Sequence, residues 1–139
     1  MIVLDTNVIS ELMRAEPDAA VLSWMERQAI AGLFTTTLSQ AEIFYGLALL
    51  PSGRRREALT AAAQPMFDVD LAGRILPFDI DAALAYPEIA AGRRQSGQPI
   101  SQVDAQIAAI VRSRGARLAT RNVRDFTDCG IEVVDPWTE

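Results

Sequence analysis

Residues 1–7 read Met-Ile-Val-Leu-Asp-Thr-Asn, and the expected architecture of the whole chain follows from them. Three consecutive apolar residues without polar alternation are typical of a strand that is buried on both faces, as in the middle of a parallel sheet. The run ends at Asp5, and apolar residues with helical spacing resume at Val8 and Ile9. Asp5 therefore lies where a central strand passes into a helix, which is the edge where open α/β sheets bind ligands. A single aspartate there can also be a helix cap, so its role depends on what else reaches this edge.

The composition restricts the chemistry that the chain can perform. Its 139 residues predict one domain over residues 1–139, long enough for a complete core, and half of them are hydrophobic. The chain has no histidine, no lysine and one cysteine. These absences exclude histidine-based catalysis, zinc sites, the P-loop and Schiff-base chemistry. Hydrolytic chemistry must therefore rest on carboxylates, hydroxyls, arginine or a hard metal held by oxygen.

Nothing in the sequence predicts export or insertion into a membrane. Asp5 and Glu11 interrupt the apolar start and no basic segment precedes it, unlike in a signal peptide. No run approaches the roughly 20 apolar residues that span a bilayer. The single cysteine, Cys129, excludes an internal disulfide and fits the reducing cytoplasm. The net charge of −5 speaks against a nucleic-acid coat protein but not against a nuclease, because bound divalent cations would reverse the local field.

Short apolar strands alternate with helices along the chain. Strands are predicted at residues 2–4, 33–36, 75–78, 117–119 and 131–134, and helices near residues 8–13, 18–31, 39–50, 54–67, 82–94 and 101–114. This order predicts right-handed crossovers and a three-layer α/β/α domain with a mostly parallel sheet of about five strands. Pro87 lies inside the fifth helix and is expected to kink or divide it.

Acidic residues from distant parts of the chain fall at one predicted edge of the sheet. Asp5 ends the first strand, Glu42 lies in the first turn of the helix after the second, and Asp104 lies in the first turn of the helix before the fourth. Helices in right-handed crossovers run antiparallel to the strands, so their first turns lie beside the carboxyl ends of the strands. Asn122 and Asp125 follow the fourth strand and reach the same edge. Such an oxygen-rich cluster selects Mg²⁺ or Mn²⁺, which bind substrate phosphates.

Two of these acids also have a purely structural interpretation. The segment from Ser39 to Glu42 matches a capping box, and the segment from Ser101 to Asp104 resembles one. The helix macrodipole also favours an acid in the first turn. Carboxylates held together raise one another's pKa, so a true cluster needs a cation to stay ionised. The sequence alone leaves both interpretations open.

Four segments together resemble the PIN-domain nucleases and, within them, the VapC toxins of bacterial toxin–antitoxin pairs, including the FitB-like branch. The segments are Met-Ile-Val-Leu-Asp-Thr-Asn-Val-Ile-Ser-Glu at 1–11, Ser-Gln-Ala-Glu-Ile-Phe-Tyr-Gly at 39–46, Pro-Ile-Ser-Gln-Val-Asp-Ala-Gln-Ile-Ala at 99–108 and Leu-Ala-Thr-Arg-Asn-Val-Arg-Asp-Phe at 118–126. They occur in order and at family-like spacing across essentially the whole chain. The resemblance implies an endoribonuclease that depends on Mg²⁺, with Mn²⁺ as a substitute. It also implies a homodimer that a VapB-type antitoxin holds inactive in a hetero-oligomer.

The resemblance carries over to individual positions of this chain. Asp5, Glu42 and Asp104 would bind the metal, and Asp125 would be a further catalytic acid. Five polar residues would orient these ligands: Thr6, Asn7, Ser39, Thr120 and Asn122. Asn122 stands where many relatives have an aspartate, so a second metal site is expected to be weak.

Three arginines near the predicted open edge are expected to contact the substrate, and they are Arg93, Arg121 and Arg124. The expected substrate is single-stranded or looped RNA, because an A-form duplex hides its bases.

Two other functions fit parts of the sequence. Asn122 suits a degenerate binding module that pairs with a partner and no longer cuts RNA. A phosphate-accepting signalling domain or phosphatase of similar layered fold also uses an aspartate after the first strand. Such domains rely on a lysine as well, and this chain has none, so that function is disfavoured.

Overall fold

β1 (Ile2–Leu4) is the middle strand of a five-stranded sheet in the computed structural model, which covers residues 1–139. The strand order is β3-β2-β1-β4-β5, with β2 at Leu33–Thr36, β3 at Ile75–Leu76, β4 at Arg117–Ala119 and β5 at Glu132–Val134. All neighbouring strands are parallel. Every residue of β1 is buried, as its uninterrupted apolar run predicts. The predicted parallel sheet is therefore confirmed.

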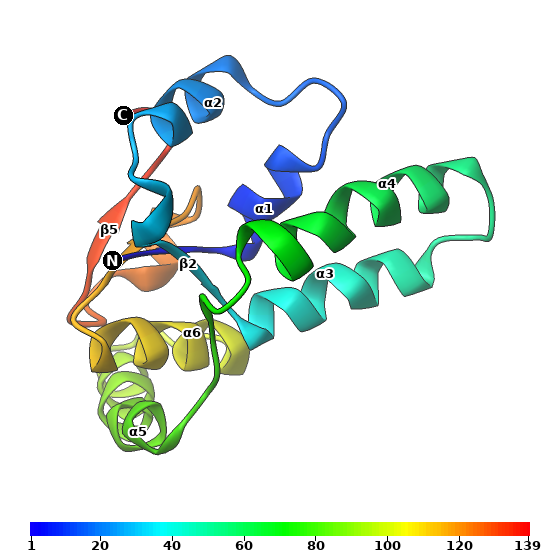
Figure 1. Cartoon of the computed structure of the whole chain (residues 1–139). Helices are drawn as coiled ribbons and strands as arrows, with labels where there is room; N and C mark the ends of the chain where they lie inside the picture. Colours follow the sequence, from blue (N-terminus) through cyan, green and yellow to red (C-terminus); the bar gives the residue numbers. More distant parts are fainter.

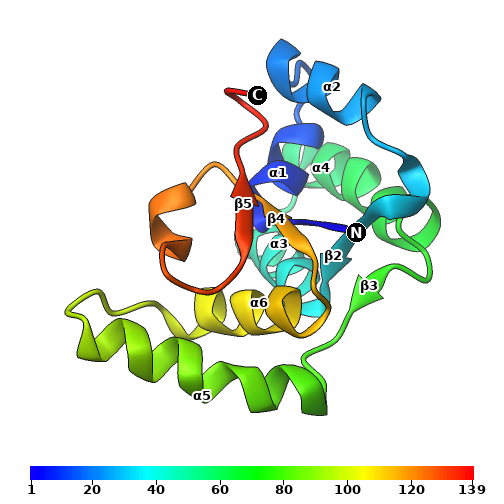
Figure 2. The ribbon, with the colours of Figure 1, turned by 90° about the vertical axis from the view of Figure 1, so that its left-hand side faces the viewer.

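Helices cover both faces of this sheet and make three layers (Figures 1 and 2). They are α1 (Thr6–Leu12), α2 (Ala19–Glu26), α3 (Thr37–Leu49), α4 (Arg54–Pro65), α5 (Ile80–Gln95) and α6 (Gln102–Ser113). Side chains alternate along β1, so Val3 packs with α5 and α6, whereas Ile2 and Leu4 pack with α1, α2, α3 and α4. Figure 2 shows α6 against the sheet and α5 outside it, and Figure 1 shows the α3–α4 hairpin extending beyond the sheet.

Buried aliphatic side chains hold these layers in place. Ile107 and Ile110 of α6 are almost fully buried against Val3 and Leu118 of the two central strands. Each fully buried aliphatic side chain contributes about 1.5–3 kcal/mol. The position of α6 relative to β1 is therefore well determined by packing, independently of any ligand.

The short connections bring three helix starts to the carboxyl edge of the sheet. A single residue, Asp5, separates β1 from α1, and its Oδ1 accepts a hydrogen bond of 2.8 Å from the N–H of Thr6. α3 follows β2 without a loop. α6 leads into β4, which is parallel to β1, so the first turn of α6 lies at this same edge.

The start of α3 differs from the prediction. Thr36 is the cap, and its Oγ1 accepts a hydrogen bond of 3.1 Å from the N–H of Ser39. Ser39 is thus a residue of the first turn rather than the cap, and Glu42 lies in the second turn. The capping box expected at Ser39 is wrong because the last residue of β2 already carries a hydroxyl in the cap position.

Other differences concern boundaries rather than topology. Pro87 does not divide α5, because Ala82 before it and Ile89 after it are both buried and hold the two halves in one helix. The remaining short turns are η1 (Ile30–Gly32), the π-helical η2 (Met66–Asp70) and η3 (Val123–Phe126).

None of the helices combines the length and the apolar character that crossing a bilayer requires.

Candidate active site

A pocket of about 520 Å³ opens at the carboxyl edge of the sheet and contains three acids from distant parts of the chain. Asp5 comes from the end of β1, Glu42 from α3 and Asp104 from α6. The other residues that line it are Thr6, Asn7, Ser10, Glu11, Arg14, Arg121, Asn122 and Trp137. The crossover geometry therefore brings together the three acids that the sequence places at one edge.

Asp5 is the most deeply placed of these acids, with 5% of its surface exposed. Its Oδ1 accepts the N–H of Thr6, and its Oδ2 accepts the hydroxyl of Thr120 at 2.7 Å. Burial raises the pKa of Asp5, and the charges of Glu42 and Asp125 raise it further, against the two hydrogen bonds that lower it. The structure thus holds a carboxylate whose ionised form lacks a compensating cation.

Glu42 lines the same pocket, and its carboxylate accepts a hydrogen bond from a hydroxyl of α1. Thr6 Oγ1 lies 2.9 Å from Glu42 Oε1 and 3.0 Å from Ser39 Oγ. A hydroxyl has one proton, and the carboxylate is the stronger acceptor for it. Because Glu42 is in the second turn of α3, its carboxylate does not cap the helix and points to another use.

Asp104 combines a capping arrangement with a carboxylate that faces the pocket. Its N–H donates to Ser101 Oγ at 3.1 Å, which confirms the predicted cap at Ser101. Burial raises the pKa of Asp104 and the charge of Asp5 raises it further, while the hydroxyl of Ser101 lowers it. The structural and the functional interpretations of this segment are therefore compatible.

Asp125 lies outside the acid pocket. It lines an adjoining hollow with Arg121, Asn122 and Arg124. Its charge nevertheless raises the pKa of both Asp5 and Asp104, so the hollow and the pocket are electrostatically connected. Asn122 lines both spaces and donates its backbone N–H to Thr120 Oγ1 at 3.1 Å.

A hydrogen-bond network connects Asp5 to the turn after β4. Asn7 Nδ2 donates to Thr120 Oγ1 at 3.1 Å, and Asn7 Oδ1 accepts the N–H of Arg121 at 3.2 Å. Thr120 is fully buried and also donates to Asp5. These contacts provide the geometry that an orienting role for Asn7 and Thr120 requires.

The three arginines predicted to contact substrate occupy different environments. Arg121 lines the acid pocket, and Arg124 lines the adjoining hollow. Arg93 is only 6% exposed, and its guanidinium donates to the carbonyl oxygens of Gln98, Asp125 and Thr127 at 2.6–2.9 Å. Arg93 is therefore a structural residue that joins two loops, and the prediction of substrate contact for it is wrong.

Sequence reasoning missed four residues of the acid pocket, namely Ser10, Glu11, Arg14 and Trp137. Glu11 lies on α1 and Arg14 lies just after its end, and the two form an ion pair at 3.0 Å. Their spacing of four and seven residues from Asn7 could have indicated that they lie on the same face of the helix. Trp137 was not among the predicted site residues. It reaches the pocket through the turn after β5, which no local pattern predicts.

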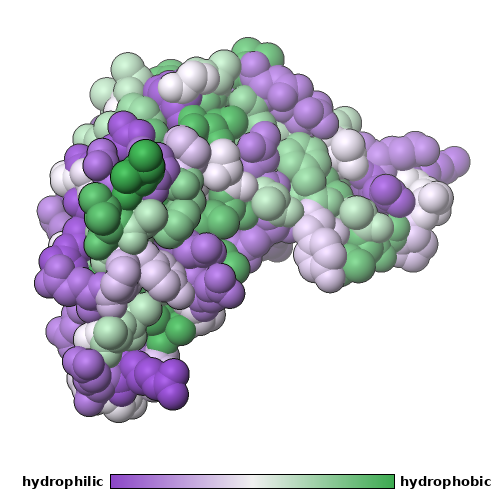
Figure 3. Space-filling view, turned by 90° about the horizontal axis from the view of Figure 1, so that it is seen from below, coloured by the Kyte–Doolittle hydropathy of each residue, from purple (hydrophilic) through white to green (hydrophobic).

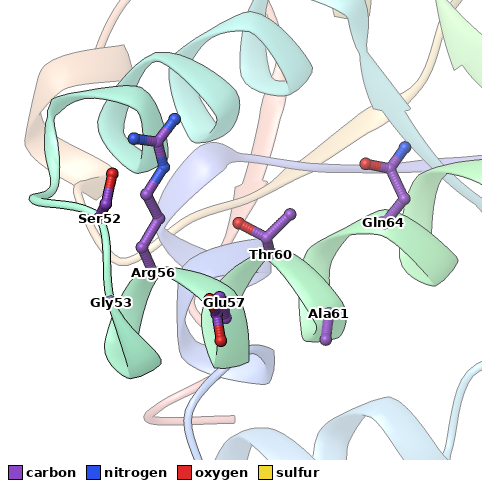
Figure 4. A pocket seen from close by; sticks show the side chains of 7 residues that line it. All are labelled: Ser52, Gly53, Arg56, Glu57, Thr60, Ala61 and Gln64. Carbon is purple, nitrogen blue, oxygen red and sulfur yellow. The ribbon is translucent and has the colours of Figure 1, made fainter.

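A second hollow, of about 460 Å³, lies along α4 and the turn before it (Figure 4). It is lined by Ser52, Gly53, Arg56, Glu57, Thr60, Ala61 and Gln64. With a single carboxylate it lacks an acid cluster, and none of the polar residues predicted to act in catalysis lines it. The acid pocket is therefore the better candidate for an active site.

The donor set of the acid pocket suits a hard divalent cation. All candidate ligands are oxygens. Burial, and after it the repulsion between neighbouring carboxylates, raises the pKa of Asp5 and Asp104, and a bound cation would offset both effects. As the side chains stand, no three of them are arranged to hold one ion directly. Mg²⁺ keeps several of its waters and needs only one or two direct carboxylate ligands, so this spacing is compatible with it.

Comparison with known proteins identifies the class. The profile of the PIN domain family matches residues 2–130, and the chain belongs to this family. It is 43% identical to the VapC ribonuclease Y4jK of Sinorhizobium fredii, with 99% of this chain and 98% of that protein covered. It is 35% identical to the toxin FitB of Neisseria gonorrhoeae, with 99% of each covered. The structure of FitAB bound to a DNA fragment superposes with a TM-score of 0.91 at 34% identity, covering 99% of this chain and 96% of that one.

Proposed function

We propose that this protein is an endoribonuclease that depends on Mg²⁺ or Mn²⁺ and acts as the toxin of a VapBC-type toxin–antitoxin pair. The observation that carries the proposal is the shared pocket of Asp5, Glu42 and Asp104. The names of the relatives, a VapC ribonuclease and the toxin FitB, support it. A cytoplasmic location is part of this proposal. RNA is present there, and the reducing conditions fit the free, buried Cys129.

Asp5, Glu42 and Asp104 are the residues that would hold the cation. The chemistry that bound Mg²⁺ supplies in such sites is a lower pKa for a water and compensation of charge on the scissile phosphate. Thr120 and the backbone of Thr6 fix both oxygens of Asp5, so its lone pairs are already oriented. The carboxylate of Asp104 forms no ion pair within the chain, which suits it to bind the ion or to accept a proton.

The remaining site residues have supporting roles in this proposal. Thr6 and Ser39 orient Glu42, and Asn7 and Thr120 orient Asp5. Asp125 adds negative charge from the adjoining hollow. We assign Arg121 and Arg124 to RNA phosphates, because both line these spaces and neither forms an ion pair within the chain.

We also infer that the protein forms a homodimer and a hetero-oligomer with a VapB-type antitoxin. Exposed apolar pairs on two helices support an interface: Tyr45 and Leu49 of α3 are each 67% exposed, and Ile80 and Leu84 of α5 are 78% and 74% exposed. The view from below shows apolar surface on the α3–α4 arm (Figure 3). Light scattering of the purified chain, alone and with its antitoxin, tests both assemblies.

The test of the activity is cleavage of labelled single-stranded RNA by antitoxin-free protein. We expect cleavage with Mg²⁺, none with a chelator, and at least a hundredfold loss in Asp5→Asn and Asp104→Asn. The matched control is Asp68→Asn, which changes an exposed acid in η2.

The alternative function is a binding module that has lost catalysis. It is suggested by Asn122, an amide at the position of the expected fourth acid. Folded, antitoxin-free protein that binds its partner and cleaves no RNA with either metal would establish that alternative. Asn122→Asp would then be expected to create activity, whereas in a working nuclease it would only strengthen metal binding.

A further inference from the structure

The acid pocket contains two arginines, and neither pairs with the candidate metal ligands. Arg14 and Arg121 both line it together with Asp5, Glu42 and Asp104. The four ion pairs of the molecule include none between these arginines and these three acids. A guanidinium beside carboxylates normally forms charge-assisted hydrogen bonds with them. Their separation here therefore needs a cause.

For Arg121 that cause is the indole of Trp137. The guanidinium carbon of Arg121 lies over the ring, 5.1 Å from its centroid. The backbone N–H of Arg121 donates to Asn7 Oδ1, which fixes the residue from the other end. Trp137 itself is restrained, because its side chain packs on the core that contains Ile2 and Leu4, and its backbone N–H donates to Asp135 Oδ1 at 2.9 Å. An exposed cation thus rests on an anchored aromatic platform.

Arg14 is restrained in a parallel way by Glu11. The carboxylate of Glu11 is 8% exposed and pairs with Arg14 at 3.0 Å, and it also accepts the N–H of Asp18. Both arginines of the pocket are therefore occupied by residues outside the candidate metal-binding set. This leaves the carboxylates of Asp5, Glu42 and Asp104 available for a metal.

We propose that Trp137 is a positioning residue that holds Arg121 at the rim of the acid pocket, where the guanidinium binds a phosphate of single-stranded RNA adjacent to the cleaved one. A guanidinium held over an aromatic ring keeps the N–H groups at its edge free to bind phosphate oxygens. The same contact keeps the guanidinium from neutralising the acids. This role rests on the proposed function, since it assumes that RNA enters this pocket.

The experiment measures two bindings that require no cleavage. Mn²⁺ alone is titrated and followed by electron paramagnetic resonance, and a labelled single-stranded RNA is followed by fluorescence anisotropy without divalent metal. The variants are Trp137→Leu, Trp137→Phe, Arg121→Met and the double variant Trp137→Leu/Arg121→Met. Arg55→Met, an exposed arginine on α4 that forms no ion pair, is the control for the loss of one positive charge.

Trp137→Leu should weaken RNA binding and Mn²⁺ binding by about five- to tenfold each, because released Arg121 then pairs with the acids. Trp137→Phe keeps an aromatic face and should lose about twofold at most. Arg121→Met should weaken RNA binding alone. The decisive result is the double variant, in which Mn²⁺ affinity returns to that of the wild type while RNA binding stays weak.

Two results would overturn the proposal. Equal Mn²⁺ affinity losses in Trp137→Leu and in the double variant would mean that the indole acts only through packing. RNA affinity in Trp137→Leu equal to that of the wild type would mean that Arg121 does not need the platform. If the expected binding pattern holds but neither the wild type nor any variant cleaves RNA, the nuclease proposal fails, whereas the role of Trp137 in positioning Arg121 for an RNA phosphate stands.

Discussion

A buried carboxylate without a cationic partner is the unusual feature at the scale of single residues. Burying an ionised group costs free energy unless hydrogen bonds and an opposite charge compensate it. Asp5 has two hydrogen bonds, and the charges of Glu42 and Asp125 repel it. A fold that served stability alone would gain by replacing it. The retained charge therefore points to a cation that the site is built to bind.

Asp5→Asn should make the metal-free protein more stable at neutral pH. The pKa of Asp5 is raised in the folded state, so the folded state binds more protons than the unfolded state between the two pKa values. The contribution of Asp5 to stability therefore falls as pH rises through the raised pKa. Urea unfolding of the two proteins should show their difference largest at pH 7 and vanishing towards the acid side. A difference independent of pH would contradict this linkage.

On acidification, metal affinity should begin to fall at a higher pH than it would if the carboxylates had their ordinary pKa values. Protons compete with the cation for Asp5 and Asp104, and the pKa of each is raised by burial first and by neighbouring charge second. Mn²⁺ titrations from pH 8 to pH 4 measure this. Asp104→Asn should shift the profile to lower pH, because it removes one of the two carboxylates whose raised pKa makes protons compete with the cation.

Arg93→Met should be strongly destabilising, by about 2–4 kcal/mol, because it leaves the carbonyl oxygens of Gln98, Asp125 and Thr127 without their donor. Arg93→Lys keeps the positive charge but lacks the planar guanidinium that donates to several carbonyl oxygens at once. It should therefore retain only part of the stability that Arg93→Met loses. Arg94→Met, the next residue and an exposed one, should change the free energy of unfolding by less than about 0.5 kcal/mol. Equal effects at the two positions in urea unfolding would refute the structural role.

At the scale of elements, the predictable features are those that local pattern determines. The buried run Ile2–Leu4 and the alternation of strands with helices correspond to β1 and to the α/β order. The start of α3 was not predictable, because Thr36, Thr37 and Ser39 all have hydroxyls and only backbone geometry selects the cap. Pro87 shows the reverse case, in which tertiary packing on α6 overrides a local helix breaker.

The cap assignment leads to a test on α3. Thr36→Val removes the acceptor for the N–H of Ser39 and should cost about 1 kcal/mol of stability. Glu42→Gln should leave stability nearly unchanged, because the carboxylate does not cap the helix. Chemical unfolding of both variants distinguishes this from a capping box, for which Glu42→Gln would also destabilise α3.

At the scale of the whole molecule, topology explains which part of the site could be predicted. Right-handed crossovers put the starts of α3 and α6 beside Asp5, so convergence of the three acids follows from element order alone. Arg93 and Trp137 could not be assigned in this way. The partners of Arg93 are loop carbonyls up to 34 residues away, and the position of Trp137 depends on the turn after β5. Local pattern contains no information about either contact.

Metal binding should therefore be visible as stability of the entire fold. A ligand that binds only the folded state stabilises it by RT ln(1 + [L]/Kd), about 2.7 kcal/mol at a hundred times Kd. Mn²⁺ or Mg²⁺ should raise the Tm of the wild type by several degrees in differential scanning fluorimetry, and a chelator should reverse the shift. Asp5→Asn should start from an equal or higher Tm without metal and show no shift, whereas Asp68→Asn should behave like the wild type. An undiminished shift in Asp5→Asn would place the cation elsewhere and remove the basis for assigning catalysis to this pocket.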